Sequence, residues 1–230
     1  MTGVASSSHL KPASASRRSA AGSRSRARSG QRPGKAKTGP VQPVAKRDQL
    51  LETAWRLFYR DGYHATGIDR ILAEADVAKM TLYKHFRSKE ELILAVLEKR
   101  SERLRESVSR YLSAKKRTPE QRLPAVFDWL VDWVKGKEFR GCFFQKAMAE
   151  YQDVHDPIHQ AALAHKTAFN DEIRRLVADA GLTRPRSLPD QLALLVEGAI
   201  VTSHAVGSTM PAVHAREAAQ ALIKAARRIR

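Results

Sequence analysis

The sequence predicts an all-α fold, in which a small head of three helices precedes a larger helical body. Apolar residues recur at helical spacing through nine segments, and no segment shows the alternation typical of a strand. Gly or Pro chemistry marks most of the breaks between these segments. The predicted helices are 47–61, 67–75, 79–86, 88–113, 119–136, 141–152, 157–180, 188–206 and 212–229.

The first two helices each have one apolar face. In residues 47–61 this face should pack across the following helices as a scaffold, and it comprises Leu51, Ala54, Trp55 and Phe58. In residues 67–75 it comprises Ile68, Ile71, Leu72 and Ala75. Thr66 and Asp69 form a T-x-x-D pair, which predicts a cap at the start of the second helix.

The third helix, residues 79–86, has two clear apolar anchors, Leu82 and Phe86, at i, i+4 spacing. Asp76 and Val77 interrupt the pattern before it, so residues 66–91 predict a helix-turn-helix. Donors on the free face suit phosphate oxygens or base edges in a major groove, and they are Lys79, Thr81, Tyr83, Lys84 and His85. A plain helical hairpin within a bundle is the alternative.

The fourth helix, residues 88–113, opens with an S-x-x-E pair, Ser88 and Glu91, which predicts a capping box. Lys89 beside it leaves a positive charge near a helix N-terminus, where a phosphate could dock.

The strings LLETAWRLFYRDGYHATGIDRIL, VAKMTLYKHF and SKEEL resemble the first four helices of TetR-type bacterial transcriptional regulators in order and spacing. The resemblance is strong over residues 47–100. Two positions depart from the family pattern: Asp76 stands where the turn usually has Gly, and Ala78 where a Ser commonly caps the recognition helix. A lost cap costs about 1 kcal/mol.

The resemblance implies which side chains contact DNA. In the groove it implies Lys79, Met80, Thr81 and Lys84, and at the phosphates Thr66, Tyr83, His85 and Lys89. It also implies a helix-turn-helix domain (47–92) and a helical ligand-binding and dimerisation domain (93–230), while composition marks residues 1–46 as a basic tail.

Residues 1–46 are predicted to be disordered. Residues 1–45 contain no acidic side chain and nine positive ones, about half of the formal net charge of +17. With few large aliphatic residues, such a segment cannot offset its ordering entropy. We expect a flexible arm that contacts DNA; an organellar transit peptide and a solubilising tail are the alternatives.

The last two helices differ from the rest in texture. Residues 188–206 are apolar on nearly all sides, and residues 212–229 are rich in small apolar side chains. Such helices form either a central core or half of an interface. In the resembling family the last two helices pair across a two-fold axis, so a homodimer is expected on a palindromic operator in double-stranded DNA.

The body contains many large rings, which indicate either a packed core or a pocket for an inducer. The candidate ligand-binding residues are Trp129, Trp133, Phe143, Phe144, Cys142, Tyr151 and Phe169. Cys142 is the only cysteine, which excludes an internal disulfide. It follows Arg140 and Gly141, and this string resembles one in TetR-type regulators that respond to electrophiles or oxidants. A packed, inert thiol is the alternative.

A metal site and an enzyme are weighed and not favoured. His155 and His159 are four apart, but Asp156-Pro157 predicts a helix start that leaves His155 outside the helix. Cys142 with His155 or His165 could form a nucleophile and base, but no catalytic motif accompanies them. No cofactor is predicted.

No apolar run approaches the ~20 residues that span a bilayer, so no membrane contact is expected. We therefore predict a cytoplasmic, nucleoid-associated transcriptional regulator, a repressor that a small-molecule inducer releases from its operator. Sensing through Cys142 is one alternative, and a DNA-architectural protein is another.

Overall fold

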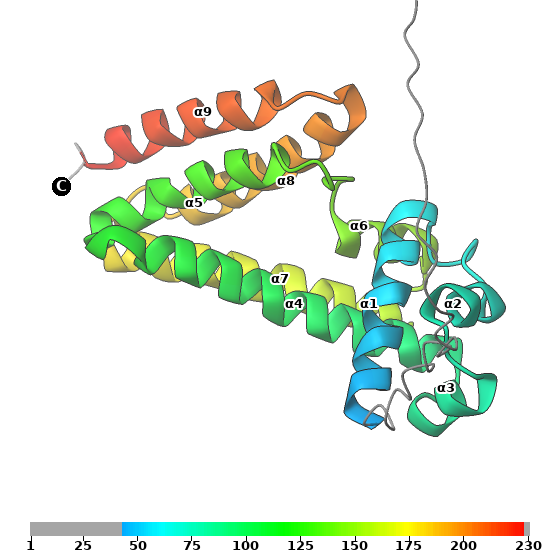
Figure 1. Cartoon of the computed structure of the whole chain (residues 1–230). Coiled ribbons are helices and arrows are strands. Elements are labelled where there is room, and N and C mark those ends of the chain that lie inside the picture. The colour runs from blue at the N-terminus through cyan, green and yellow to red at the C-terminus, as the bar shows by residue number, and fades with distance from the viewer. Residues whose placement is uncertain (1–42, 228–230) are drawn as a thin grey trace, which may run out of the picture. The chain divides into compact units, whose positions relative to one another are not determined.

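The computed structural model describes residues 43–227, and residues 1–42 and 228–230 lie outside it. Almost all of the predicted tail therefore lies outside the described residues. Between residues 43 and 227 the fold contains no strand, which confirms the predicted all-α class (Figure 1). The helices are α1 Pro43–Asp61, α2 Ile68–Ala75, α3 Lys79–His85, α4 Lys89–Ser113, α5 Pro119–Val134, α6 Phe143–Glu150, α7 Pro157–Asp179, α8 Leu188–Val206 and α9 Met210–Arg227.

Helix boundaries follow local chemistry closely. Helix α1 begins at Pro43, earlier than the predicted residue 47, and a single 3₁₀ turn, Ala114–Lys116, follows α4. At α7 the predicted cap is confirmed, because the Asp156 carboxylate accepts a hydrogen bond of 2.7 Å from the Ile158 N–H and Pro157 is the first helical residue. Helix α8 ends at Gly207, whose φ of 62° is left-handed and suits glycine.

The predicted cap at Thr66 is wrong. Gly67 is the N-cap of α2 and makes no side-chain cap, while the buried Thr66 hydroxyl donates to the Gly62 carbonyl at 2.7 Å. The α2–α3 turn matches the expectation, since Asp76 adopts a left-handed conformation with φ 47°. Ala78 is the N-cap of α3 and offers no side-chain acceptor.

The capping box before α4 is half confirmed. The Ser88 hydroxyl accepts from the Glu91 N–H at 3.2 Å, as predicted. The Glu91 carboxylate reaches one residue further back and accepts from the Arg87 N–H at 2.7 Å.

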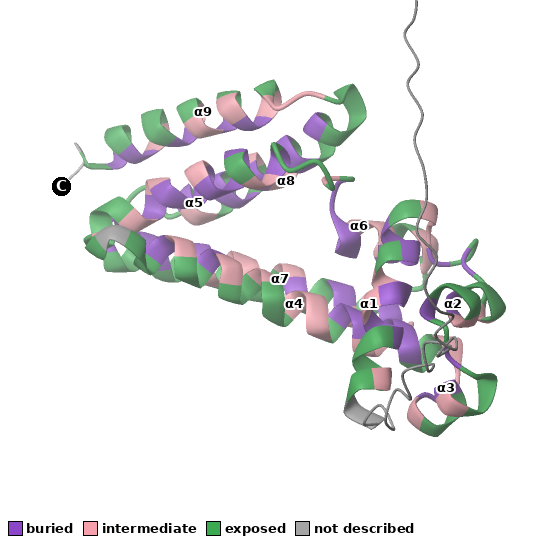
Figure 2. Ribbon diagram, in the orientation of Figure 1, coloured by how far each residue is buried: buried purple, intermediate pink, exposed green. Residues whose placement is uncertain are grey.

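The core of the head lies where α1, α2 and α3 meet. Leu82 and Phe86 are almost fully buried, and so are Ile71, Ala75 and Phe58 (Figure 2). Trp55 corrects the prediction for α1: it is only half-buried and lines a cavity on the body side instead of packing under the recognition helix.

The body consists of packed helices that are joined to the head by α4. Helix α4 packs against α1, α5 and α7, and it continues without a break through residues 92 and 93 (Figure 1). Helix α9 packs against α5 and α8. None of the helices within residues 43–227 is long and apolar enough to cross a membrane.

Helix α8 is apolar on two sides, and only one side is core. Leu192, Val196 and Ile200 are buried against the body, whereas Leu194 and Val201 are 71% and 50% exposed. Gly198 lies between these two with open space beside it. The outer stripe of α8, defined as Leu194, Gly198, Val201 and Ala205, therefore repeats at helical spacing on an uncovered face.

Candidate functional site

The recognition helix α3 is held by its buried side and free on the other. Leu82 is fully buried beside Phe86, and the four residues Lys79, Met80, Tyr83 and Lys84 are exposed. Met80 is 71% exposed. Thr81 and His85 are half-buried at the edges of this face.

Two predicted phosphate contacts lie in different settings. The Thr66 side chain is fully buried and its hydroxyl is used within the head, so it offers nothing to solvent. Lys89 is half-buried, and its ammonium group donates to the His64 carbonyl at 3.4 Å. Burial lowers the pKa of Lys89 from its usual value.

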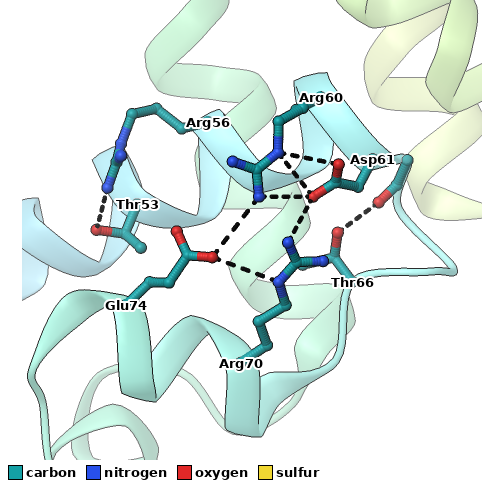
Figure 3. A network of polar contacts seen from close by, with 8 residues as sticks. Thr53, Arg56, Arg60, Asp61, Thr66, Arg70 and Glu74 are labelled. Carbon is teal, nitrogen blue, oxygen red and sulfur yellow. Dashed lines mark hydrogen bonds and ion pairs between the residues drawn. The ribbon is translucent and has the colours of Figure 1, made fainter.

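Four charged side chains fix α2 against the end of α1. The Arg70 guanidinium lies 3.1 Å from the Asp61 carboxylate and 3.3 Å from that of Glu74, and Arg60 contacts both acids as well (Figure 3). These pairs are partly solvated, so each contributes little by itself. Together they link the end of α1 to α2.

A cavity of about 360 Å³ lies between the head and the body, within the size range of small-molecule sites. Helices α1 and α4 form part of its wall, and the segment from the end of α5 to the start of α6 forms the rest. Its lining residues are Trp55, Tyr59, Arg100, Leu104, Trp133, Gly136, Lys137, Glu138, Phe139, Gly141, Cys142, Phe143 and Phe144.

Four of the seven candidate ligand-binding residues meet in this cavity: Trp133, Cys142, Phe143 and Phe144. Trp129 lies behind Trp133, with the two rings stacked at 5.5 Å. Tyr151 and Phe169 do not join them. Tyr151 packs against Tyr63 and His64, and Phe169 lines a separate hollow between α4 and α7.

Nine of the thirteen lining residues were not predicted from the sequence, and three of them have side chains that matter here: Trp55, Tyr59 and Arg100. Trp55 was assigned to the scaffold helix, and Tyr59 was not assigned a role. Arg100 lies mid-way along a long charged helix. The Tyr59 hydroxyl donates to the Gly141 carbonyl and accepts from the Arg140 N–H, each at 2.8 Å. Burial raises the pKa of Tyr59.

Gly141 is required at this junction for two reasons. Its φ of +83° is strained for any other residue, and a Cβ would lie 3.1 Å from the His204 ring. The next residue, Cys142, is buried and is the N-cap of α6, where its Sγ accepts from the Gln145 N–H at 3.4 Å. The thiol therefore both packs and lines the cavity.

The histidines that suggested a metal site are used locally. His159 Nδ1 lies 2.7 Å from the Tyr151 carbonyl oxygen, and the His155 N–H donates to the Asp153 carboxylate. Residues 43–227 contain no group of three or more metal-ligand side chains. His165 stacks on Phe144 at 3.5 Å with Nδ1 2.9 Å from the Ser101 hydroxyl.

A second junction joins α6 to the turn between α1 and α2. The Glu150 carboxylate accepts hydrogen bonds from the backbone N–H groups of Tyr63 and His64, at 2.9 and 2.7 Å. The Tyr63 hydroxyl donates to the Phe143 carbonyl at 2.9 Å. Helix α6 thus contacts the head at both of its ends, and its first two residues, Phe143 and Phe144, line the cavity.

An exposed recognition helix on a helical body with its own cavity defines a helix-turn-helix regulator. Two family models match the chain: bacterial regulatory proteins of the tetR family over residues 50–96, and the tetracyclin repressor-like C-terminal domain over residues 119–219. A TetR-family transcriptional regulator from Streptomyces coelicolor has a similar structure, with a TM-score of 0.72 and 33% identity. That match covers 79% of this chain and 95% of the other. The chain belongs to the TetR family.

Relatives in sequence are also transcriptional regulators. The transcriptional activator FasR of Mycolicibacterium smegmatis is 41% identical over 92 residues, which cover 39% of this chain and only 41% of FasR. The regulator YjdC of Escherichia coli K12 is 26% identical over 155 residues, covering 67% of this chain and 81% of YjdC.

Proposed function

We propose that this regulator binds a palindromic operator as a homodimer and releases it when a small molecule enters the cavity beside α1. The observation that carries the proposal is the wall of that cavity. It is shared between the DNA-binding head, through Trp55 and Tyr59, and the body, through α4 and the start of α6. A ligand there contacts both parts at once.

On the DNA side we assign the groove contacts to Lys79, Met80, Thr81 and Lys84, as the family resemblance implies. Tyr83, His85 and Lys89 are assigned to phosphates, and the buried Thr66 side chain is withdrawn from that set. Phosphate contacts supply most of the affinity, and the few groove contacts supply sequence preference.

We attribute the release of DNA to the two contacts that join the α6 region to the head, Tyr59 with Gly141 and Tyr63 with Glu150. A ligand between Trp55 and Phe143 competes for the space that the Tyr59–Gly141 contact now closes. Because α1 carries α2 through the ion pairs of Figure 3, a shift of α1 moves α3 with it. Two heads that must match two half-sites about 34 Å apart tolerate little such movement.

The homodimer is proposed to form through the outer stripe of α8. Exposed Leu194 and Val201 flank a glycine, which allows close helix approach in a two-fold pair. We place the dimer in the cytoplasm, bound to the nucleoid, and propose that it represses transcription. Because FasR is named an activator, activation is the alternative that the experiment must distinguish.

The decisive experiment is to sequence genomic DNA recovered with the purified protein, then footprint the recovered site. A palindromic motif protected by one dimer supports the proposal. Recovery without sequence preference would instead indicate an architectural DNA-binding protein. A reporter that rises on deletion of the gene supports repression, and one that falls shows activation.

A second candidate, sensing of electrophiles through Cys142, is favoured by one observation: this cysteine lines the cavity wall. A thiol-reactive electrophile in the cavity would alkylate Sγ, with loss of the thiol proton, and remove the acceptor at the α6 N-terminus. Cys142→Ser should then keep operator binding but no longer release DNA under the electrophile. Equal responses of variant and parent would make the cysteine structural.

A further inference from the structure

Two cations line the cavity beside α1, and one of them, Arg100, stacks on an aromatic ring. Six aromatic side chains line it, and they are Trp55, Tyr59, Trp133, Phe139, Phe143 and Phe144. Arg100 enters from α4 and lies with its guanidinium carbon 3.7 Å from the centre of the Trp55 ring. A planar cation stacked on an aromatic wall keeps its N–H groups free at the edge.

Arg100 has no acceptor for those N–H groups within the part of the chain that the structure describes. Glu52, the acid that acts most strongly on the charge of Arg100, is paired with Arg103 at 2.5 Å. The Tyr59 hydroxyl is committed to Gly141 and Arg140. Glu138, the one acid among the lining residues of the cavity, is exposed. The Glu52 carboxylate is thus paired with Arg103, and Arg100 has no ion-pair partner within residues 43–227.

Arg100 is half-buried, and this strengthens the attraction of its unpaired charge for an anion. Burial lowers the pKa of Arg100 from its usual value, yet a guanidinium stays protonated at any physiological pH. A charge that is partly removed from water and lacks an acceptor gains more from an incoming anion than a fully hydrated one does. A guanidinium also fits a carboxylate through two parallel hydrogen bonds.

From this geometry we infer that the effector is an aromatic carboxylate, with its ring among the aromatic side chains of the cavity and its carboxylate paired with Arg100. This inference rests on the proposed ligand-controlled function and names the class of ligand. A cationic effector would suit the rings but would face Arg100 and Lys137 at the same wall.

The test compares two isosteric probes, naphthalene-2-carboxylate and naphthalene-2-carboxamide, by calorimetric titration of the full-length protein. The carboxylate should bind at least about tenfold more tightly than the amide. Arg100→Gln should abolish this preference, and Arg100→Lys, which keeps the charge without the fork, should retain part of it. Lys224→Gln removes an exposed cation from α9, which does not line the cavity, and should leave the preference intact.

All three tryptophans of the chain provide an independent readout, because Trp55 and Trp133 line the cavity and Trp129 stacks on Trp133. Carboxylate binding should quench their fluorescence in the parent. Far-UV circular dichroism establishes that Arg100→Gln is folded. Carboxylate and amide binding equally, neither binding, or an unchanged preference in folded Arg100→Gln each overturns the inference.

Operator release is measured separately by fluorescence anisotropy of labelled DNA. Binding of the carboxylate through Arg100 without release of DNA would uphold the ligand class and reject the proposed release mechanism. Equal release of DNA by the amide and the carboxylate would uphold the proposed release mechanism and reject the ligand class.

Discussion

The carboxylate of Glu150, at the end of α6, accepts a hydrogen bond of 2.9 Å from the backbone N–H of Tyr63 in the head. Its second oxygen accepts from the His64 N–H at 2.7 Å. One side chain of the body therefore holds two N–H groups of the turn that sets the direction of α2. This contact is made across 87 residues of sequence.

Glu150→Gln tests the strength of that contact. An amide offers one acceptor and one donor group, so one of the two N–H groups would face another donor. We expect the free energy of unfolding to fall by about 1 to 2 kcal/mol, as for the loss of a charged hydrogen bond. Urea denaturation measures it. The same change at Glu98, an exposed residue of α4, should be neutral, and an equal loss at both positions would contradict the assignment.

Lys84→Ala tests the groove face of α3. Lys84 is exposed and makes no hydrogen bond or ion pair within residues 43–227, so the thermal midpoint should not change. Operator affinity should fall by about tenfold or more, and affinity for unrelated DNA by less, because a base contact carries discrimination as well as charge. Lys224→Ala on α9 removes the same charge from an exposed site and is the control. Equal losses on operator and unrelated DNA would reassign Lys84 to a phosphate.

Ala78→Ser should restore the missing cap of α3. The backbone of Ala78 already has the extended conformation of an N-cap, with φ −65° and ψ 144°, so a serine hydroxyl there can accept from an N–H of the first turn. We expect stabilisation of about 1 kcal/mol. Ala73→Ser, in the middle of α2, should instead destabilise by a few tenths of a kcal/mol. Denaturation curves of both variants distinguish a cap from a general effect of serine.

Acid should destabilise the fold through His165. Burial between Phe144 and α4, with the nearby Lys166 and Arg105, lowers its pKa from 6.5 to about 4. Between these values the unfolded chain binds a proton that the folded chain does not, so stability is full above pH 6.5 and falls on acidification towards pH 4. The loss amounts to as much as about 3 kcal/mol.

The measurement is the free energy of unfolding of His165→Gln and of the parent from pH 7 to pH 4. Other groups titrate in the same range, so the difference between the two proteins is the informative quantity. The stability advantage of the parent over the variant should shrink or reverse sign on acidification. The reason is that only the parent has an imidazole that takes up a proton on unfolding. A difference that is independent of pH would show that His165 titrates normally.

Local chemistry predicted the individual helices of this fold well, but it predicted poorly which helices pack together. Asp156 with Pro157, Ser88 and the anchors Leu82 and Phe86 act within one or two turns of helix, so their roles are legible in the sequence. Periodicity does not say which helices meet. Trp55 was predicted to be scaffold, but it lines the cavity and stacks with Arg100 of α4. Tyr151 was predicted to be a cavity ring, but it packs against Tyr63 and His64 of the head.

Arg100 shows the same limit more sharply. Its neighbours along α4 are charged and many are exposed, which is typical of a solvated helix face. Only the approach of Trp55 from α1, and the use of Glu52 by Arg103, leave this one cation stacked and without an acceptor. Both facts belong to the packing of two helices and have no signature in either helix alone.

Val201→Lys tests the proposed dimer. Val201 is 50% exposed on the outer stripe of α8, so the substitution should not disturb the folded monomer. In a two-fold pair through this stripe it would bury two unpaired charges, and this should shift the protein to monomer in analytical ultracentrifugation. Operator affinity should fall with it, since one head reads only a half-site. Val154→Lys makes the same change at a valine that is 54% exposed in the loop before α7, and it should leave both properties intact. A Val201→Lys protein that stays dimeric would move the interface away from α8.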